Sequence, residues 1–395
     1  MRHLLLISSS SVSLLALLAM PIQTIAQEQQ NVPHPPHYVV TDLGTLGGTF
    51  SLAYGVNASR QVGGVAQLAG GNQHAFVWRD DHMTDLGTLG GPNSVAGGPA
   101  ETGGQWAILS DTSATDPLGE DFCGFGTNLI CLGAVWEDGE MIPLATLGGN
   151  NAEAFTANDR GQVVGAAENA TYDLNCPLPQ VLRFEAVMWG PRPGEIRELR
   201  PLHGDSVGFA LGLNDLGQAV GSSGSCADTT TNSVTGLVAG PHAVLWDCDG
   251  SATDLGNLGG KLINTGAAIN NRGEVVGGSD LPGDKAAHAF LWTREKGMQD
   301  LGTLGTDPMS LAGWINNTGQ VVGWSCDADG NCRAYFWQDN VMTDLNTLIP
   351  SNSPLYLMNA FGINDSGEIA GLALQISTGD VHAFLATPCE WCRDD

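Results

Sequence analysis

The stretch TDLGTLGG, from Thr41 to Gly48, is repeated along the sequence, and this repeat is the strongest indication of the fold. An identical copy runs from Thr84 to Gly91. A phrase that recurs at intervals of roughly 45 to 58 residues is typical of a repeat architecture, in which each copy is one small structural unit. The altered copies are LATLGG at 144–149, TDLGNLGG at 253–260, QDLGTLG at 299–305 and TDLNTL at 343–348.

Each unit contains four short apolar segments separated by turn-forming residues. In the fifth unit these segments are 253–255, 267–270, 274–277 and 288–292. The segments hold β-branched or aromatic residues, and the gaps hold Gly, Asn or Asp, which is the pattern of short strands joined by turns. One unit is therefore predicted to contain four strands.

A tight turn is predicted between the second and third segments, where Asn is followed by Gly three positions later. Gly takes a positive φ without steric cost, and Asn tolerates it better than most residues. The first unit departs from the pattern because Arg60 stands at the Gly position, and the second unit keeps only Gly104 and Gln105. The stretches that fit are 158–161, 214–217, 270–273, 316–319 and 364–367.

The fourth segment recurs as HAFVW, HAVLW, HAFLW and related strings, and it counts the units. Seven units of four short antiparallel strands predict an all-β, seven-bladed β-propeller, whereas a β-solenoid would need atypical end caps that the sequence lacks. The unpaired strand at 38–43 is predicted to close the last blade, which leaves no open sheet edge. The segments end at Trp78, Trp136, Trp189, Trp246, Trp292 and Trp337, and the last contains Leu385.

The two ends of the chain are assigned from their composition. Residues 1–26 combine Arg2, an apolar stretch and a small residue at the expected cleavage point, and they are predicted to be a signal peptide. The mature protein is then secreted or periplasmic, and a monomer is expected. No later stretch is long and apolar enough to span a membrane. Residues 27–37 form a polar, Pro-rich linker, 38–387 the propeller and 388–395 a Cys-containing tail.

The charge balance limits the partners that the protein can bind. The chain has 15 Lys and Arg against 42 Asp and Glu, which gives a formal net charge of −27. Such a surface repels phosphate backbones and anionic membranes, so nucleic acid is not expected as a partner. Cations, neutral glycans and basic proteins remain open, and acidity also keeps an exported protein soluble.

The repeated LGTLGG, INNTGQVVG (315–323) and HAFLW (288–292) strings together resemble the HAF family of probable extracellular repeat proteins, which is named for its His-Ala-Phe triplet. The resemblance covers the chain from Val39 to about Phe384. It implies export from a bacterial cell and an array of repeats. It supplies no catalytic motif that can be carried over, and the second unit departs most from the family pattern.

Two polar positions recur from unit to unit, one occupied by His and one by Asp. Hydrogen bonds between His and Asp on neighbouring strands are expected. A metal site is not predicted, because equivalent positions in different blades diverge and cannot meet at the roughly 2 Å that metal ligands need. The residues are His74, His242, His288 and His382 with Asp42, Asp85, Asp254, Asp300 and Asp344.

Tryptophan at the end of the fourth segment is expected to lie in the core, where its large ring fills the gap between blades. Trp106, Trp314 and Trp324 stand at other positions and remain candidates for stacking against a sugar.

The nine cysteines of an exported chain are expected to form disulfides. The strand at 242–246 separates Cys226 from Cys248 by roughly 17 to 20 Å, which excludes a bond between them because bonded Cα atoms lie within about 7 Å. Cys248 is therefore predicted to be free. The predicted pairs are Cys123–Cys131, Cys326–Cys332, Cys176–Cys226 and Cys389–Cys392.

Known catalytic and metal-binding motifs are missing from the sequence. Asp327–Asn331 is similar to a calcium loop, but Cys332 occupies the sixth position, where an EF-hand requires Gly. This stretch is predicted to be a turn, and calcium stays open as the one cofactor to test. The sequence has no GxSxG, HExxH or phosphate-binding Gly loop, so no catalytic residue is assigned.

Longer loops follow the third segment in three consecutive units, at 109–131, 166–184 and 222–241. Loops at equivalent positions share one face of a ring, and insertions gathered on one face are often the binding surface. We call these three segments the insertion loops. Their candidate binding residues are carboxylates and aromatics, namely Asp111, Asp116, Glu120, Asp121, Phe122, Phe125, Glu168, Tyr172, Asp173 and Asp228.

Two hypotheses about function follow from the insertion loops. In the first, the protein is a non-enzymatic binding or surface-interaction module for a glycan or protein ligand. In the second, it is a polysaccharide hydrolase or lyase whose acid/base pair is drawn from the loop carboxylates, such as Glu120 and Glu168. A glycosidase pair needs about 5 to 9.5 Å between its carboxyl groups, and loops that have drifted without selection would give neither function.

Overall fold

The computed structural model describes residues 35–231 and 238–389 of the 395-residue chain. These residues belong to one compact unit, Pro35–Asp395, and the predicted signal peptide lies outside the described residues. The fold is all-β, and the single helical element in the described part is the short 3-10 turn η1 (Leu345–Thr347). No helix among these residues has the length and apolarity needed to cross a membrane.

Three four-stranded antiparallel sheets follow one another in the second half of the chain. Each sheet is built from consecutive segments of one sequence unit, as the repeat predicts. The first contains β14 (Val207–Leu213), β15 (Ala219–Gly224), β18 (His242–Trp246) and β19 (Ala252–Asp254). The second contains β20 (Asn264–Ile269), β21 (Val275–Asp280), β22 (Ala287–Thr293) and β23 (Gly297–Gly302), and the third contains β24 (Met309–Ile315), β25 (Val321–Cys326), β26 (Cys332–Gln338) and β27 (Val341–Asp344).

The remaining units pair in the same order but are joined into two larger sheets. Single parallel contacts make the joins, between Phe50 and Val381 and between Gly98 and Thr156. The strands are β2 (Gly47–Val56), β3 (Val62–Leu68), β4 (Gln73–Arg79), β5 (His82–Asp85), β6 (Gly90–Pro99), β7 (Trp106–Thr115), β8 (Leu129–Glu137), β9 (Glu140–Pro143), β10 (Gly148–Ala157), β11 (Val163–Tyr172), β12 (Leu182–Trp189), β13 (Ile196–Leu199), β28 (Leu355–Ile363), β29 (Ile369–Gln375) and β30 (Val381–Cys389). A small ribbon joins β16 (Thr230–Thr231) to β17 (Val238–Ala239).

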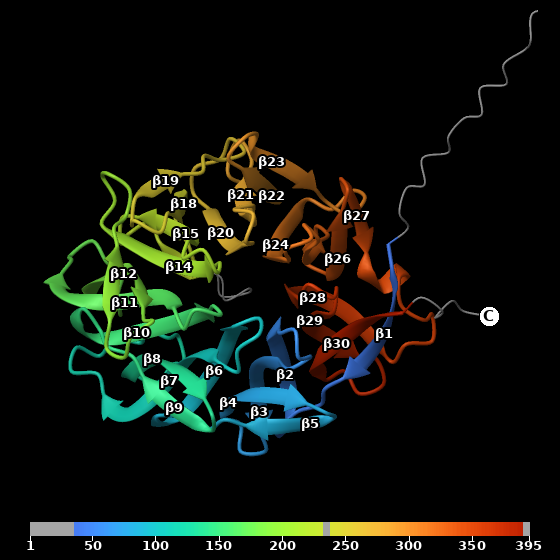
Figure 1. The fold of residues 1–395 in the computed structure, drawn as a ribbon, viewed down its shortest axis with the longest axis horizontal. Helices are drawn as coiled ribbons and strands as arrows, with labels where there is room; N and C mark the ends of the chain where they lie inside the picture. Colours follow the sequence, from blue (N-terminus) through green and yellow to red (C-terminus); the bar gives the residue numbers. More distant parts are fainter. Residues whose placement is uncertain (1–34, 232–237, 390–395) are drawn as a thin grey trace, which may run out of the picture. The chain divides into compact units, whose positions relative to one another are not determined.

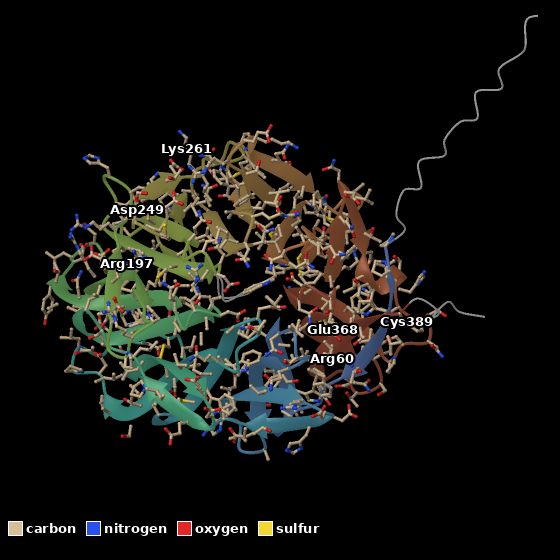
Figure 2. All side chains as sticks on the ribbon, viewed as in Figure 1. Arg60, Arg197, Asp249, Lys261, Glu368 and Cys389 are labelled. Carbon is tan, nitrogen blue, oxygen red and sulfur yellow. A yellow bond between two sulfur atoms is a disulfide. The ribbon has the colours of Figure 1, made fainter. Side chains whose placement is uncertain are left out.

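The first strand of the chain pairs with the last. Strand β1 (His37–Asp42) runs antiparallel to β30, with Asp42 opposite Phe384 and His37 opposite Cys389. The prediction that the N-terminal strand joins the final unit is confirmed, and β30 continues two residues past the predicted limit at 387. The turns of the first and last units are also joined, because Nε of Arg60 lies 2.7 Å from Oε1 of Glu368 (Figure 2).

Within this unit the sheets follow one another around a ring, with β2, β6, β10, β14, β20, β24 and β28 nearest its middle (Figure 1). The TDLG phrase forms the outer strand of a sheet, as in β5 and β19, and LGG leads inward to the next sheet. The outermost strand of one sheet is thus followed directly by the innermost strand of the next.

The Asn-x-x-Gly turns form as predicted. In the third unit the Gly161 N–H donates to the Asn158 carbonyl, and Gly161 has a φ of 72°. Arg60 takes a φ of 60° in the first unit, so the same turn forms there without Gly. The second unit has a longer connection, in which the Ala100 N–H donates to the carbonyl of Gln105.

The core lies between neighbouring sheets, where the tryptophans of the fourth segments pack. Trp246 is fully buried in a cluster that also contains Val164, Leu199 and Leu213. Trp189 is almost fully buried in another cluster. Trp106 and Trp324 are likewise buried, at 0% and 1% exposure, which leaves neither ring a free face for a sugar.

Candidate functional site

Asparagine side chains join successive turns in the middle of the ring. In each Asn-x-x-Gly turn, the Asn Oδ1 accepts backbone N–H bonds from its own turn, and Nδ2 donates to the Asn carbonyl of the next unit. The last turn donates to the first, from Asn364 to the carbonyl of Asn57 at 3.0 Å. We call this set the asparagine ring, and its bonds run from Asn158 to Asn214, Asn214 to Asn270, Asn270 to Asn316, Asn316 to Asn364 and Asn364 to Asn57.

A second layer of polar bonds lies beside the asparagine ring, one residue further along each turn. The backbone N–H of Asp215 donates to Oδ1 of Asn271, and that of Asn317 donates to Oδ1 of Asp365. The first unit has Ala58 at this position, which carries no acceptor. Glu101 of the second unit brings a carboxylate there instead, close to the backbone of Asp365.

Glu101 is held in a strongly acidic setting. Burial, followed by the charges of Asp365, Asp159 and Asp215, raises the pKa of Glu101 to about 7. Its Oε1 is buried and has no hydrogen-bond partner among the described residues. The group therefore titrates near neutrality in the centre of the ring.

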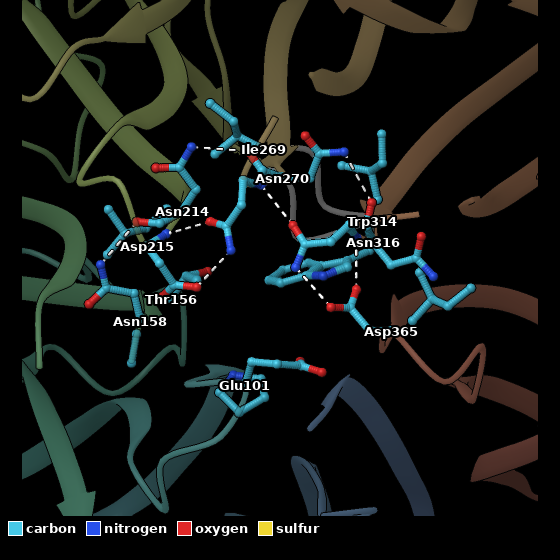
Figure 3. Close-up of a pocket in the computed structure, with 17 residues that line it drawn as sticks. Glu101, Thr156, Asn158, Asn214, Asp215, Ile269, Asn270, Trp314, Asn316 and Asp365 are labelled. Carbon is cyan, nitrogen blue, oxygen red and sulfur yellow. Dashed lines mark hydrogen bonds between the residues drawn. The ribbon is translucent and has the colours of Figure 1, made fainter. Parts of the chain in front are cut away.

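These two layers line a small central cavity of about 60 Å³ (Figure 3). Trp314 of β24 extends across it toward β6, so that a Cβ added to Gly98 would lie 2.9 Å from Cη2 of the indole. The described residues that line the cavity include carboxylates and amides but no Lys, Arg or His. The chemistry of the cavity is thus an aromatic surface next to many hydrogen-bond acceptors.

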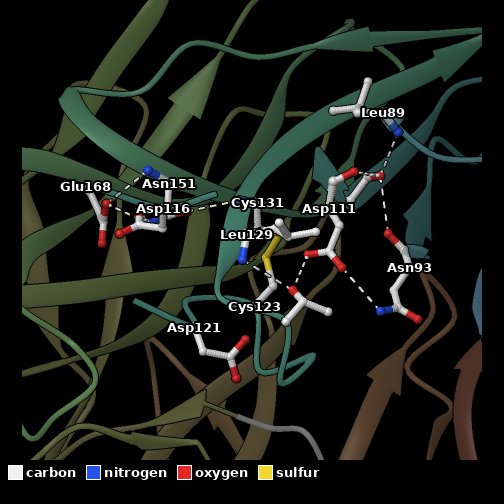
Figure 4. Close-up of a disulfide and its surroundings, with 12 residues drawn as sticks. Leu89, Asn93, Asp111, Asp116, Asp121, Cys123, Leu129, Cys131, Asn151 and Glu168 are labelled. Atoms are coloured by element: carbon white, nitrogen blue, oxygen red, sulfur yellow. Dashed lines mark hydrogen bonds between the residues drawn. A yellow bond between two sulfur atoms is a disulfide. The ribbon is translucent and has the colours of Figure 1, made fainter. Parts of the chain in front are cut away.

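The insertion loops are fastened to one another. A disulfide joins Cys176 of the third unit to Cys226 of the fourth. The backbone N–H groups of Val181 and Leu182 donate to Oε1 of Glu120 in the second unit, at 2.7 and 2.8 Å. The three loops therefore form one connected structure, whose part around Cys123–Cys131 is shown in Figure 4.

Glu120 and Glu168 meet at the centre of this structure. Both residues are 0% exposed, and their carboxyl groups lie close enough for each to influence the other's pKa. Gln180 Nε2 donates to both, at 3.1 Å to Glu120 and 2.8 Å to Glu168. Burial first, and then the charge of Glu120, raise the pKa of Glu168 to about 7, and burial also raises the pKa of Glu120.

The structure places most of the predicted loop carboxylates inside the protein. Asp111 is buried and accepts bonds from Asn93 and Thr127, and Asp116 accepts a bond from Asn151 at 3.0 Å (Figure 4). Buried Asp173 pairs with Arg183 at 2.8 Å. These side chains hold the loops in shape.

The other predicted residues are more accessible. Phe122 is half-buried against Phe184, with ring centroids 5.8 Å apart, and Phe125 is half-buried as well. Half-buried Asp121 accepts the backbone N–H of Gly126. Tyr172 is 63% exposed, and Asp228 is exposed.

Two exposed residues in the insertion loop of the third unit are not among the predicted site residues. Leu174 is 101% exposed and Leu178 is 85% exposed, on either side of the disulfide-bonded Cys176. Apolar residues next to Pro177 and Pro179 in an insertion were the available signal. With Tyr172 they form what we call the apolar tip.

Most of the recurrent His residues form hydrogen bonds with the recurrent Asp residues. His74 bonds Asp85, His288 bonds Asp300 and His382 bonds Asp42, with Nδ1 to carboxylate distances of 2.9 to 3.0 Å. His242 differs, because it bonds Asp205 instead of the expected Asp254. In the described part of the chain, no group of three His, Cys, Asp or Glu is arranged to hold a metal ion.

Three of the predicted disulfides are confirmed, namely Cys123–Cys131, Cys176–Cys226 and Cys326–Cys332. Cys248 is free and exposed, as expected. Cys392 lies outside the described residues, so its pairing with Cys389 stays a prediction. Asp327 accepts the N–H groups of Asp329 and Asn331, which makes that stretch a turn.

Comparison with protein-family models finds no match, and comparison with curated proteins finds none either. Solved β-propellers are similar in fold. They include the β-propeller domain of the Trilobed protease from Pyrococcus furiosus (9% identity over 74% of this chain and 81% of that chain, TM-score 0.46), a putative TolB from Agrobacterium tumefaciens (12%, 78% and 95%, TM-score 0.44) and an oligogalacturonate lyase in complex with manganese (12%, 90% and 97%, TM-score 0.46). At these identities the likeness says nothing about activity.

Proposed function

We propose that the chain is an exported β-propeller of seven four-stranded blades that acts as a non-enzymatic binding module through its insertion loops. The pairing pattern supports seven blades, because each sequence unit supplies one set of four strands and β1 completes the last set with β28, β29 and β30. Membership of the HAF family and export of the chain belong to the same proposal. The three disulfides agree with an oxidising compartment.

The observation that carries the binding role is the apolar tip. Tyr172, Leu174 and Leu178 are 63%, 101% and 85% exposed on a loop that a disulfide and buried hydrogen bonds hold in place. The three side chains lie on one loop, and several exposed apolar side chains close together in the chain of a soluble protein favour an interaction site. Because the loop is already ordered, binding there costs little conformational entropy.

Charge narrows the partner to a protein with a basic surface around an apolar one. The segments 109–131, 166–184 and 222–241 contain one basic residue, Arg183, and it is paired with Asp173. Of their seven acidic residues, Asp121 and Asp228 are accessible, and a positive partner surface complements these two. The acids are Asp111, Asp116, Glu120, Asp121, Glu168, Asp173 and Asp228.

The loop carboxylates give the polysaccharide-cleaving alternative little support. Glu120 and Glu168 share one donor, Gln180 Nε2, and Glu120 also accepts the backbone N–H groups of Val181 and Leu182. Both are completely buried, so a glycan cannot reach them with the loops in this conformation. The pair serves to hold the loops together.

The test compares two sets of matched substitutions. The apolar tip is changed by Tyr172→Ser, Leu174→Ser and Leu178→Ser, and the control changes Leu216→Ser, Leu262→Ser and Ile376→Ser, which are 49%, 62% and 61% exposed elsewhere. Proteins from the surface of the source cells are captured on the immobilised chain, purified and titrated against each variant. Loss of affinity in the tip variant alone supports the proposal, and equal affinity for both variants contradicts it.

A second candidate site is the central cavity. Its acceptors and the Trp314 indole favour a small organic cation, which both an aromatic face and carboxylates attract. Glu101 Oε1 supplies an acceptor that lacks a partner. Saturation-transfer NMR with tetramethylammonium tests this. Neutral tert-butanol is the control ligand, and calcium chloride is added as a competitor. A signal from tetramethylammonium that Trp314→Leu removes supports the site, and the same signal from tert-butanol contradicts it.

A further inference from the structure

We propose that Glu120 and Glu168 form a pH-sensitive latch, in which one shared proton fastens the insertion loop of the second unit to that of the third. The latch concerns the conformation of the loops. It holds whether or not the apolar tip binds a partner.

The positions of the two residues make them a connection between units. Glu120 lies in the loop after β7, and Glu168 lies near the end of β11. Glu168 accepts the backbone N–H groups of Asn150 and Asn151, at 3.1 and 2.9 Å, so it is fixed to its own unit. Glu120 accepts from Val181 and Leu182, which belong to the far end of the third unit's loop.

The contact requires a proton. Two ionised carboxylates in contact, both 0% exposed, repel each other, and one of them keeps its proton in such a site. Oε1 of Glu120 already accepts N–H bonds from Gln180, Val181 and Leu182. Oε2 of Glu120 is buried and has no partner among the described residues. It is the oxygen left to carry the proton toward Glu168.

Among the described charged groups around the pair, none is an unpaired cation that could neutralise it in place of the proton. The loop after β7 contributes Asp116 and Asp121, and β10 contributes Glu153, all of them acidic. The loop after β11 contributes Asp173, and β12 contributes Arg183, but these two are paired at 2.8 Å. Ionising the pair therefore adds negative charge to a region that is already negative.

The pH range follows from the acid that shares the proton. Burial, followed by Glu120, raises the pKa of Glu168 to about 7. Burial, followed by Glu168 and Asp121, raises the pKa of nearby Glu153 to about 8. A raised pKa means that the folded loops hold the proton below this range and lose it above. The proton therefore stabilises the closed latch fully below about pH 4.5, and this stabilisation is lost as the pH rises through 7.

Hydrogen exchange of the full chain at pH 5.5 and 8.5, corrected for the intrinsic rate, measures the opening. We expect the corrected protection of residues 116–128 and 173–182 to fall on the order of tenfold for each pH unit between pH 5.5 and the folded pKa of about 7, and then to level off, while the turn at 327–331 keeps its corrected protection. Equal corrected protection at the two pH values would overturn the latch. This comparison needs only the wild-type chain.

Two substitutions identify the groups. Glu120→Gln replaces the shared proton with an amide that donates at every pH, so protection should no longer fall at pH 8.5. Asp280→Asn is the matched control, because Asp280 is a buried carboxylate beside Gly260 as Glu168 is beside Gly149, and it accepts the Ile263 N–H without a second carboxyl group. A Glu120→Gln chain that keeps the wild-type pH dependence would refute the assignment, as would an Asp280→Asn chain that loses it.

Discussion

Glu153 makes the protein less stable as the pH rises, and Glu153→Gln removes most of this effect. The side chain is 7% exposed on β10, and burial is the main cause that raises its pKa from 4.5 to about 8. A folded pKa above the unfolded one means that the native state binds the extra proton. The stabilisation is complete below pH 4.5 and is lost as the pH rises through 8.

The magnitude follows from the two pKa values. One pKa unit corresponds to about 1.4 kcal/mol, so between pH 5 and pH 8 the free energy of unfolding should fall by about 3 to 4 kcal/mol on account of Glu153 alone. Glutamine has the same shape and no titrating proton. Urea unfolding at the two pH values should therefore show a decrease that is smaller by about 3 kcal/mol in Glu153→Gln than in the wild type.

The control for this experiment is Glu140→Gln, which changes an exposed glutamate on β9. It should leave the pH dependence as in the wild type. The reasoning is refuted when Glu153→Gln and the wild type lose the same free energy between pH 5 and pH 8. Glu101 remains in both proteins, so its contribution cancels in the comparison.

Three further substitutions test the forces that hold the ring together. Asn270→Ala removes bonds to Asn316, Glu274 and its own turn, and should lower the free energy of unfolding by about 1 to 3 kcal/mol. Asn271→Ala removes fewer buried bonds and should lower it by less. The reverse order in urea unfolding would contradict the role of the asparagine ring. Gly277→Ala places a Cβ 2.0 Å from the Thr265 carbonyl oxygen, so thermal unfolding should show at least about 1 to 3 kcal/mol of destabilisation. The control is Gly70→Ala, where a Cβ meets nothing within 4 Å and φ is not positive, and an equal loss there would argue against the clash. Replacing both Cys176 and Cys226 with Ala should cost up to about 4 kcal/mol, more than the roughly 2.5 kcal/mol for Cys123 and Cys131, because it opens a longer loop; equal costs by denaturant titration would show that loop length is not the cause.

Much of the fold was predictable because its signals are local. The Asn-x-x-Gly stretches form their turns, and the unpaired strand at the start pairs with β30. What the turns do for one another was not predictable. Asn214 bonds the carbonyl of Asn270, 56 residues along the chain, and a local pattern explains that Asn by its backbone preference alone. The bond appears only once the units stand around a ring.

The candidate site was predicted less well, for reasons of burial. The insertion loops were recognised by their length, and Glu120 and Glu168 were named together, but a count of carboxylates does not reveal that they face inward. The cross-loop bonds from Val181 and Leu182 turn Glu120 away from solvent. Leu174 and Leu178 are the opposite case, since apolar residues are normally expected in the core and here they lie outside.

The affinity of the chain for a purified partner, measured by biolayer interferometry on three proteins side by side, tests the binding role most directly. The proteins are the wild type, the variant with serine at Tyr172, Leu174 and Leu178, and the variant with serine at Leu216, Leu262 and Ile376. The apolar tip is predicted to matter alone, so its variant should bind at least tenfold more weakly, while the control binds as the wild type does and salt weakens the wild-type complex. Unchanged affinity in the tip variant, with the chain folded, would contradict the role of the insertion loops.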